Sequence, residues 1–256
     1  MHVETRIGDG VATVVLNRPD RKNAVTVDMR SDIREAFERL AYNDDARVVV
    51  LTGAGDAFCA GADVGGMGGR GLVASRARVR TLQQTVLAIH SLEKPVVAAV
   101  RGAAVGFGWS LALACDLILA SSTARFSQVF QRVGLAPDGG SAYFLTRNLG
   151  VLRAKELIFS TRMVSADEAL ALGLVNQVFA DDVFDDAVRE SAQRLGAGPS
   201  FAMGLAKKMV HATAGQSLET FFETELLIQS QLTQTADYRE GTAAFREKRV
   251  PHFIGE

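Results

Sequence analysis

KPVVAAVRGAAVGFG, residues 94–108, is the stretch of sequence that decides the fold. Residues 95–100 are a short run of small and β-branched apolar residues, which predicts a buried strand. The glycines that follow let the backbone approach a ligand, and residues 110–114 predict an apolar helix whose start points free N–H groups outward. Tight packing or a plain turn explains such glycines equally well, and the third glycine of a dinucleotide fingerprint is missing here.

A second junction of the same kind lies earlier in the chain. Residues 48–52 predict a strand, and AFCAGAD, residues 57–63, follows it. Further strands are predicted at residues 11–16 and 116–120, and an amphipathic helix is predicted at residues 28–41. Strands that alternate with helices indicate an α/β fold with crossover connections.

From Gly139 onward the pattern is helical. Residues 165–168, SADE, match a capping box. Further helical segments are predicted at residues 183–195, 201–214, 218–234 and 238–248. The apolar residues of this tail need a partner surface, which a second subunit would supply. Residues 61–71 hold six glycines in eleven positions, which predicts a loop or a flap that closes over a ligand.

Composition excludes several classes of partner. The chain has 256 residues, is 48% hydrophobic and carries 28 basic and 29 acidic residues, so we expect one main domain with a small appendage. Mixed charges with a net charge of −1 argue against nucleic acid or anionic membrane as a partner. No apolar stretch approaches the roughly 18 residues of a membrane span. The N-terminus does not look like a secretory signal, and Cys59 and Cys115 suggest no disulfide framework, so a cytoplasmic location is expected.

Four blocks of sequence carry a family likeness. They are LNRPDRKNA (16–24), FCAGADV (58–64), KPVVAAVRGAAVGFG (94–108) and LALACDLILAS (111–121). In order and spacing they resemble motifs of the enoyl-CoA hydratase/isomerase (crotonase) family, and SADEALALGLVNQV and ADYREGTAAFREKR resemble its later landmarks. The pattern is most similar to ring-type enoyl-CoA isomerases of phenylacetate pathways.

The resemblance implies an architecture. We expect an α/β fold of the crotonase (ClpP-like) type, a spiral of ββα units with two near-perpendicular sheets. Residues 1–195 would form this core, and residues 196–256 would form a C-terminal helical trimerisation region. The likeness also implies a homotrimer, or a dimer of trimers, that binds an acyl-CoA thioester.

The resemblance further implies an oxyanion hole. Its two donors would be the backbone N–H groups of Ala62 and Phe107. Family members usually have Gly or Ala at the second position, but the departure matters little because only the backbone donates. Fixed N–H donors aimed at a thioester oxygen stabilise an enolate more than the ground-state carbonyl.

The proton-transfer group is Asp138, by the same resemblance. The two glutamates of family hydratases are replaced by Ser110 and Phe130, which argues against simple hydration because that reaction needs carboxylates to hold and deprotonate water. Asp138, in GLAPDGGS, resembles an aspartate that related isomerases use for proton transfer. Alternatively it caps a helix that starts near Gly139. Capping would lower its pKa, whereas apolar neighbours would raise it.

Coenzyme A, as part of the substrate, is the only cofactor expected, and no metal site is proposed. The resemblance points to Arg21, Lys22 and Ala24 in the first motif and to Ala60, Ala62 and Asp63 in the second. Lys248 would reach the nucleotide of a neighbouring subunit. These charged residues are equally compatible with a solvated surface, and Asp63 with a basic partner.

Three functions remain open from sequence. The first is an acyl-CoA isomerase in which Asp138 moves a proton between two carbons. The second is a hydratase or hydrolase of a special acyl-CoA, with Ser110, Gln128 or Gln131 positioning water. The third is an acyl-CoA-binding protein without catalysis, because both hydratase glutamates are absent.

Overall fold

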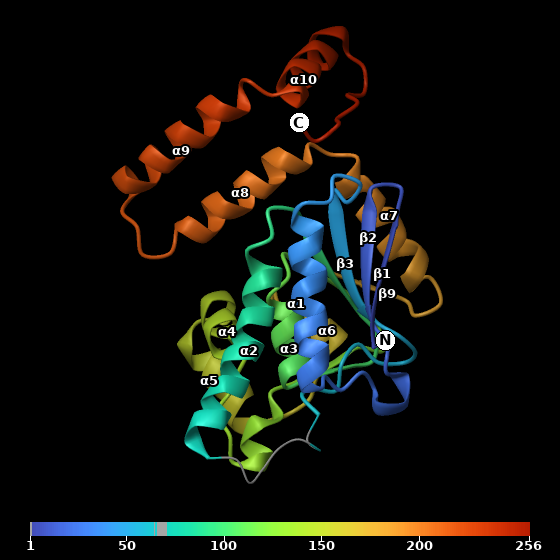
Figure 1. Ribbon diagram of the computed structural model, residues 1–256, viewed down its shortest axis with the longest axis vertical. Helices are drawn as coiled ribbons and strands as arrows, with labels where there is room; N and C mark the ends of the chain where they lie inside the picture. The colour runs from blue at the N-terminus through green and yellow to red at the C-terminus, as the bar shows by residue number, and fades with distance from the viewer. Residues whose placement is uncertain (1, 64, 66–70) are drawn as a thin grey trace.

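The computed structural model describes residues 2–63, 65 and 71–256, and its centre is a six-stranded sheet (Figure 1). The strand order is β1-β2-β3-β4-β6-β9. β1 pairs antiparallel with β2, and the other neighbours pair in parallel. Parallel neighbours require crossover connections, as the alternation of strands and helices predicted. The strands are β1 (Val3–Gly8), β2 (Val11–Leu16), β3 (Val48–Gly53), β4 (Val96–Val100), β6 (Leu117–Ser121) and β9 (Gln177–Phe179).

A second, three-stranded sheet lies beside the first. It consists of β5 (Ala103–Val105), β7 (Arg125–Ser127) and β8 (Val164–Ser165) in the order β5-β7-β8. Only Arg101 and Gly102 separate β4 from β5, so the chain passes from one sheet to the other within two residues. Gly102 has a φ of +58°, and a Cβ there would lie 2.0 Å from the carbonyl oxygen of Asp56, so only glycine fits this step.

Both faces of the large sheet are covered. Alternate residues of β3 point to opposite sides: Val49 and Leu51 belong to the core shared with the helices α1 and α2, whereas Val48 and Val50 pack against α7 on the other face (Figure 1). This explains why the parallel strands are continuous apolar runs and not alternating ones. The helices on these faces are α1 (Val27–Ala41), α2 (Leu72–His90) and α7 (Phe184–Gly196).

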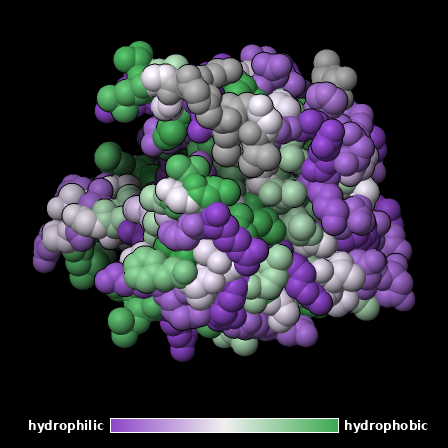
Figure 2. Space-filling model, turned by 90° about the horizontal axis from the view of Figure 1, so that it is seen from below, coloured by the Kyte–Doolittle hydropathy of each residue, from purple (hydrophilic) through white to green (hydrophobic). Residues whose placement is uncertain are grey.

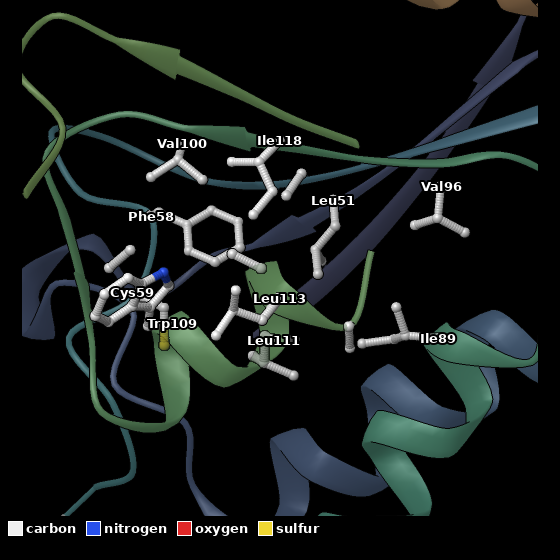
Figure 3. Packing of buried hydrophobic residues seen from close by; sticks show 14 of the residues in the cluster. Leu51, Phe58, Cys59, Ile89, Val96, Val100, Trp109, Leu111, Leu113 and Ile118 are labelled. Carbon is white, nitrogen blue, oxygen red and sulfur yellow. The ribbon is translucent and has the colours of Figure 1, made fainter. Parts of the chain in front are cut away.

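The helix α3 (Phe107–Leu113) lies inside the core, and all seven of its residues are buried. Figure 3 shows Trp109, Leu111 and Leu113 packed against side chains of the strands and of the segment that carries Phe58. A helix that is apolar on every side is stable only in such a place. The helix begins at Phe107, three residues before the predicted start at Ser110, because Ser110 N–H already donates to the carbonyl of Gly106 at 3.1 Å.

Shorter helices complete the core, and the predicted capping box is confirmed only in its first half, because the carboxylate of Glu168 binds Arg162. Ser165 Oγ accepts a hydrogen bond from the N–H of Glu168 at 3.2 Å and so begins α6. Within the glycine-rich stretch 61–71, residues 64 and 66–70 lie outside the described residues. The remaining helical elements of the core are η1 (Pro19–Arg21), η3 (Val129–Val133), α4 (Ser141–Leu149), α5 (Val151–Ser160) and α6 (Ala166–Ala171).

Three helices follow α7: α8 (Ser200–Ala212), α9 (Leu218–Leu232) and α10 (Ala236–Glu247). The last two extend away from the sheets (Figure 1). Among its described residues α9 buries none, and Leu226 and Leu227 are 65% and 63% exposed. In the part of the chain that the structure describes, no helix is long and apolar enough to cross a bilayer.

The packing of α3 against residues 57–60 gives a test of the fold. A Cβ at Gly108 would lie 2.1 Å from the carbonyl oxygen of Cys59, so Gly108→Ala must push two backbone segments apart. We expect it to lower the free energy of unfolding by about 1–3 kcal/mol or more, measured by urea denaturation. Gly8→Ala is the matched control, because a Cβ there meets nothing within 4 Å. Equal stability of the two variants would contradict this account.

Candidate active site

The first and second motifs are held together by backbone hydrogen bonds. The N–H of Ala60 donates to the carbonyl of Lys22 at 2.8 Å. Val25 then pairs with the second motif in both directions: its N–H donates to Gly61 at 2.8 Å, and its carbonyl accepts from Asp63 at 2.9 Å. Residues 36 to 38 positions apart in sequence therefore form one rigid unit.

The side chain of Asn23 stabilises the backbone around these paired motifs, although sequence analysis did not single it out. Its side chain is fully buried and accepts from the N–H of Arg18 at 2.8 Å. The amide nitrogen donates to the carbonyls of Ala54 at 2.9 Å and Ala57 at 2.7 Å. All of these partners are backbone groups, and the bond to Ala57 is fully buried, where a carbonyl without a partner would cost about 1–3 kcal/mol. The only sequence signal for this role was its position in the first motif.

The N–H of Ala62 points away from Val25 and the first motif. It belongs to the same peptide unit as the carbonyl of Gly61, and that carbonyl faces Val25. In a trans peptide the N–H points opposite to the C=O, so the Ala62 N–H faces the other way. Among the described residues it has no hydrogen-bond acceptor.

The N–H of Phe107 is oriented by the same reasoning. The carbonyl of Gly106 points into α3 and accepts from the N–H of Ser110, so the Phe107 N–H points out of the helix. It also lacks an acceptor within the described part of the chain. A Cβ at Gly61, which has a φ of +110°, would lie 3.8 Å from the Phe107 nitrogen, so the two glycine-flanked turns are in contact.

Ala62 and Phe107 both line one cavity of about 340 Å³. The α1, α2 and η3 elements form its walls together with the two turns, and Leu82, Phe130 and Leu135 supply apolar surface. Figure 2 views the molecule from the end at which α2 begins, where hydrophobic residues gather on one half of the face and hydrophilic residues cover the opposite side. The volume is within the usual range for a small-molecule site.

Asp138 contributes the one carboxylate among the described residues that line this cavity. Its Oδ1 is buried and has no hydrogen-bond partner. Burial raises the pKa of Asp138 from 3.8 to about 6, and the opposing effects of Arg30 and Arg78 are smaller. Asp138 does not cap a helix: α4 begins at Ser141, and no side chain caps it. Of the two predicted effects on this pKa, desolvation prevails.

Ser110 and Gly139 position the backbone of Asp138. Ser110 is fully buried behind the cavity, and its hydroxyl donates to the carbonyl of Asp138 at 3.0 Å, as does that of Ser141. A Cβ at Gly139, where φ is +61°, would lie 2.7 Å from the Ser110 Cβ. Of the two positions that hold glutamate in family hydratases, Phe130 thus lies in the cavity wall and Ser110 lies outside it.

The structure brings most of the predicted coenzyme-binding residues together. Arg21 and Lys22 are exposed on the first motif, beside Ala60 of the second. The remaining members of this group contact Arg18: the carbonyl of Ala24 accepts from it at 3.1 Å, and Asp63 forms an ion pair with it. The hydrogen bond from Arg18 lowers the pKa of Asp63, so the predicted basic partner of Asp63 is confirmed.

Lys248 lies elsewhere in the chain. It is exposed and follows α10 in a left-handed conformation, with a φ of +56°. In Figure 1, α10 and the start of α1 lie at opposite ends of the long axis. A role for Lys248 beside the first motif therefore requires another subunit, as the resemblance implied.

Sequence analysis missed the three arginines that line the cavity, Arg30, Arg78 and Arg132. Arg30, on α1, is only 3% exposed, and Arg78 lies on α2. A guanidinium nitrogen of Arg30 donates to the carbonyl of Arg78 at 3.3 Å, whereas its Nε has no partner. The available signal was helical spacing, because Arg30 precedes the buried Ile33 and Phe37 by three and seven positions and so lies on the inward face.

A larger cavity of about 580 Å³ lies between the core and α8. His90 and His211 stack there with their ring centroids 3.9 Å apart, and Asp116 accepts from Lys207 at 2.9 Å. Neither of the glycine-flanked turns lines it. Within residues 2–63, 65 and 71–256, no group of three or more histidine, cysteine, aspartate or glutamate side chains is placed to hold a metal ion.

Comparisons with known proteins match nearly the whole chain to one family. A family model described as "Enoyl-CoA hydratase/isomerase" matches residues 6–256. A protein of Rhodobacter capsulatus, described as a probable enoyl-CoA hydratase, is 39% identical over 99% of this chain and 98% of its own. The 1,2-epoxyphenylacetyl-CoA isomerase of Escherichia coli is 35% identical over 100% of this chain and 97% of its own length. The crystal structure of an enoyl-CoA hydratase from Bacillus anthracis superposes with a TM-score of 0.95 at 31% identity and covers 100% of both chains.

The burial of Asp138 predicts a dependence of stability on pH. Because its pKa is raised to about 6, the folded protein holds a proton that the unfolded chain releases near 3.8, and stability is lost as pH rises through this window. Asp138→Asn removes that loss. We expect the variant to be more stable than the parent at pH 7.5 by about 1–3 kcal/mol in urea denaturation, with the difference much reduced at pH 4.

Asp63→Asn is the contrasting control. The pKa of Asp63 is lowered, so its ion pair with Arg18 stabilises the fold at neutral pH and this contribution disappears in acid. We expect this variant to be less stable than the parent at pH 7.5. A change of the same sign in both variants would contradict the assignment for Asp138.

Proposed function

This chain belongs to the enoyl-CoA hydratase/isomerase family, and we propose that it is an acyl-CoA isomerase that works through a thioester enolate. One observation carries the proposal. The partly buried carboxylate of Asp138, whose pKa is raised, lines the same cavity as Ala62 and Phe107. The backbone N–H groups of these two residues have no acceptor in the described part of the chain.

The two N–H groups would bind the thioester oxygen. When a proton leaves a carbon next to the carbonyl or conjugated with it, negative charge moves to that oxygen. Donors that are held by the backbone need no reorganisation as this charge appears, so they stabilise the enolate more than the substrate. Support for this role comes from the rigid attachment of Ala62 to Val25 and of Phe107 to α3.

Asp138 would carry the proton between two carbons. Its carboxylate removes a proton from the α or γ carbon and becomes a carboxylic acid, and the enolate forms. The same acid then returns the proton to the other position, so a C=C bond moves and no atom is gained or lost. A pKa of about 6 suits this task, since the group is mostly ionised at pH 7 and still a useful base.

Hydration receives less support from this cavity. Water addition needs one group to deprotonate water and another to protonate carbon, and Asp138 has no second carboxylate beside it in the described lining. Ser110, Gln128 and Gln131 are also missing from the described lining. The relative named 1,2-epoxyphenylacetyl-CoA isomerase favours isomerisation, whereas other relatives are named hydratases.

Coenzyme A would lie along the joined motifs. Arg21 and Lys22 offer cations for its phosphates, and the backbone around Ala24 and Ala60 offers hydrogen bonds. The exposed apolar residues of α9 support a homotrimer, or a dimer of trimers, with residues 1–195 as core and residues 196–256 as the trimerisation region. In such an assembly Lys248 would contact the nucleotide of a neighbouring subunit.

The role of Asp138 can be measured with a β,γ-enoyl-CoA in deuterated water. We expect Asp138→Asn to lower kcat by about 100-fold or more, because the variant has no proton acceptor, while the affinity for CoA thioesters stays the same. Asp167→Asn, on the exposed start of α6, is the control and should keep full activity.

The same assay separates the three functions. Deuterium incorporation at carbon without solvent oxygen-18 in the product supports isomerisation. Incorporation of oxygen-18 would support hydration or hydrolysis, and tight binding without any exchange would support a non-catalytic binder. Undiminished isomerisation by Asp138→Asn would remove this residue from the mechanism.

Activity should follow the ionisation of Asp138. The base form is the active one, so kcat is expected to rise about tenfold per pH unit below pH 6 and to level off above it. The residual rate of Asp138→Asn should show no such rise. A parent profile that is flat between pH 5 and pH 8 would show that another group is the base.

A further inference from the structure

Resting on the proposed function, we propose that the acyl group of the substrate carries a carboxylate of its own, which Arg30 and Arg78 bind inside the cavity. The substrate class would then be the mono-CoA thioesters of dicarboxylic acids.

Arg30 is a buried cation that forms no ion pair with any residue the structure describes. Only 3% of the residue is exposed, and one guanidinium nitrogen donates to the carbonyl of Arg78 while Nε donates to nothing. A guanidinium has five N–H donors and stays charged under all ordinary conditions. Buried charges are normally paired, because removing a charge from water without a partner is costly.

Arg78 adds a second positive charge to the same wall. Its carbonyl accepts from Arg30 and from the hydroxyl of Thr81. Within residues 2–63, 65 and 71–256, no carboxylate lies within 4.0 Å of either guanidinium. Burial and the neighbouring Arg78 both lower the pKa of Arg30, which is the direction expected for two cations that share one wall.

Two partly buried arginines elsewhere in this chain are paired with carboxylates. Arg18, with 18% of its side chain exposed, forms an ion pair with Asp63. Arg101, with 25% exposed, binds both Asp181 and Asp185. Arg30 is more buried than either and has no carboxylate within 4.0 Å among the described residues; Arg47, which is less buried, binds the carbonyl of Phe253 instead of a carboxylate.

Asp138 does not fill this role. With the described residues it forms no ion pair and its Oδ1 no hydrogen bond, and its pKa is raised although both arginines act to lower it. Arg132 also lines the cavity, where its guanidinium donates to the hydroxyl and carbonyl of Thr161 and remains a cation. Three guanidinium groups and one carboxylate leave an excess of positive charge, which grows when Asp138 takes up a proton.

A substrate carboxylate would restore the balance. It can accept two N–H bonds from one guanidinium in parallel, a geometry that fixes orientation as well as charge. The Nε of Arg30, which has no partner among the described residues, would be one donor of such a pair. An acyl group with only carbon and hydrogen would instead leave the buried Arg30 without a carboxylate partner.

The test compares two saturated probes by isothermal titration calorimetry. Glutaryl-CoA ends in a carboxylate, and its terminal amide has the same shape without the charge; neither has a double bond to move. We expect the parent protein to bind glutaryl-CoA about tenfold more tightly than the amide or better. Arg30→Gln and Arg78→Gln should each reduce this preference and leave the affinity for the amide unchanged.

Arg34→Gln is the matched control on the same helix. Arg34 lies one turn beyond Arg30, outside the cavity lining, and faces Glu38 and Gln84. It should keep the full preference for the carboxylate. Arg78 is partly exposed, so its variant keeps the test valid if Arg30→Gln does not fold.

Three outcomes would overturn the inference. Equal affinity of the parent for both probes would show that the cavity does not select a carboxylate, while isomerase activity on uncharged substrates would leave the proposed function intact. A preference that survives both arginine substitutions would exclude these residues. Failure of both probes to bind would overturn the proposed function and this inference together.

Discussion

The close approach of the α3 backbone to residues 57–62 is the constraint on which the site depends. The carbonyl of Cys59 accepts from the N–H of Val105 at 3.0 Å and lies where any side chain at Gly108 would have to go. This contact puts the turn before α3 against the turn that ends the second motif. Since both turns are also tied to buried strands, the N–H groups of Ala62 and Phe107 are fixed by the core itself and not by flexible side chains.

Burial of α3 also sets the electrostatics of the cavity. α3 is buried on every side, as Figure 3 shows for its apolar side chains, and the hydroxyl of its Ser110 donates to the backbone carbonyl of Asp138 and not to the carboxylate. The loss of hydration therefore raises the pKa of Asp138. The same low-polarity surroundings strengthen hydrogen bonds to a developing oxyanion. The ionised carboxylate of Asp138 would be the catalytic base, yet burial makes this ionised form unfavourable in the folded protein. Folding stability and catalysis therefore place opposite demands on Asp138.

Sequence patterns predicted the scaffold better than the cavity. The parallel strands, the Ser165 cap and the two glycine junctions follow from local rules, because each depends on neighbours within a few residues. The start of α3 was placed too late, since the helix begins in the glycine turn itself. Arg30 could not be recognised from spacing alone: an inward-facing position normally holds an apolar residue, and its partner carbonyl lies 48 residues away. The position of Asp138 depended on Gly139 and Gly140, whose left-handed conformations turn the chain so that the carboxylate does not cap α4.

Asp138 and Arg30 are best understood together. Each is a charged group that burial makes unfavourable, and the shift in pKa shows that their attraction does not compensate for the loss of water. A cavity of this kind is incomplete without its ligand, because favourable contacts remain unused on both groups. Binding energy from a charged part of the substrate would be gained away from the reacting carbons. In the scheme that we propose, it would hold the acyl chain so that the proton transfer takes place between fixed atoms.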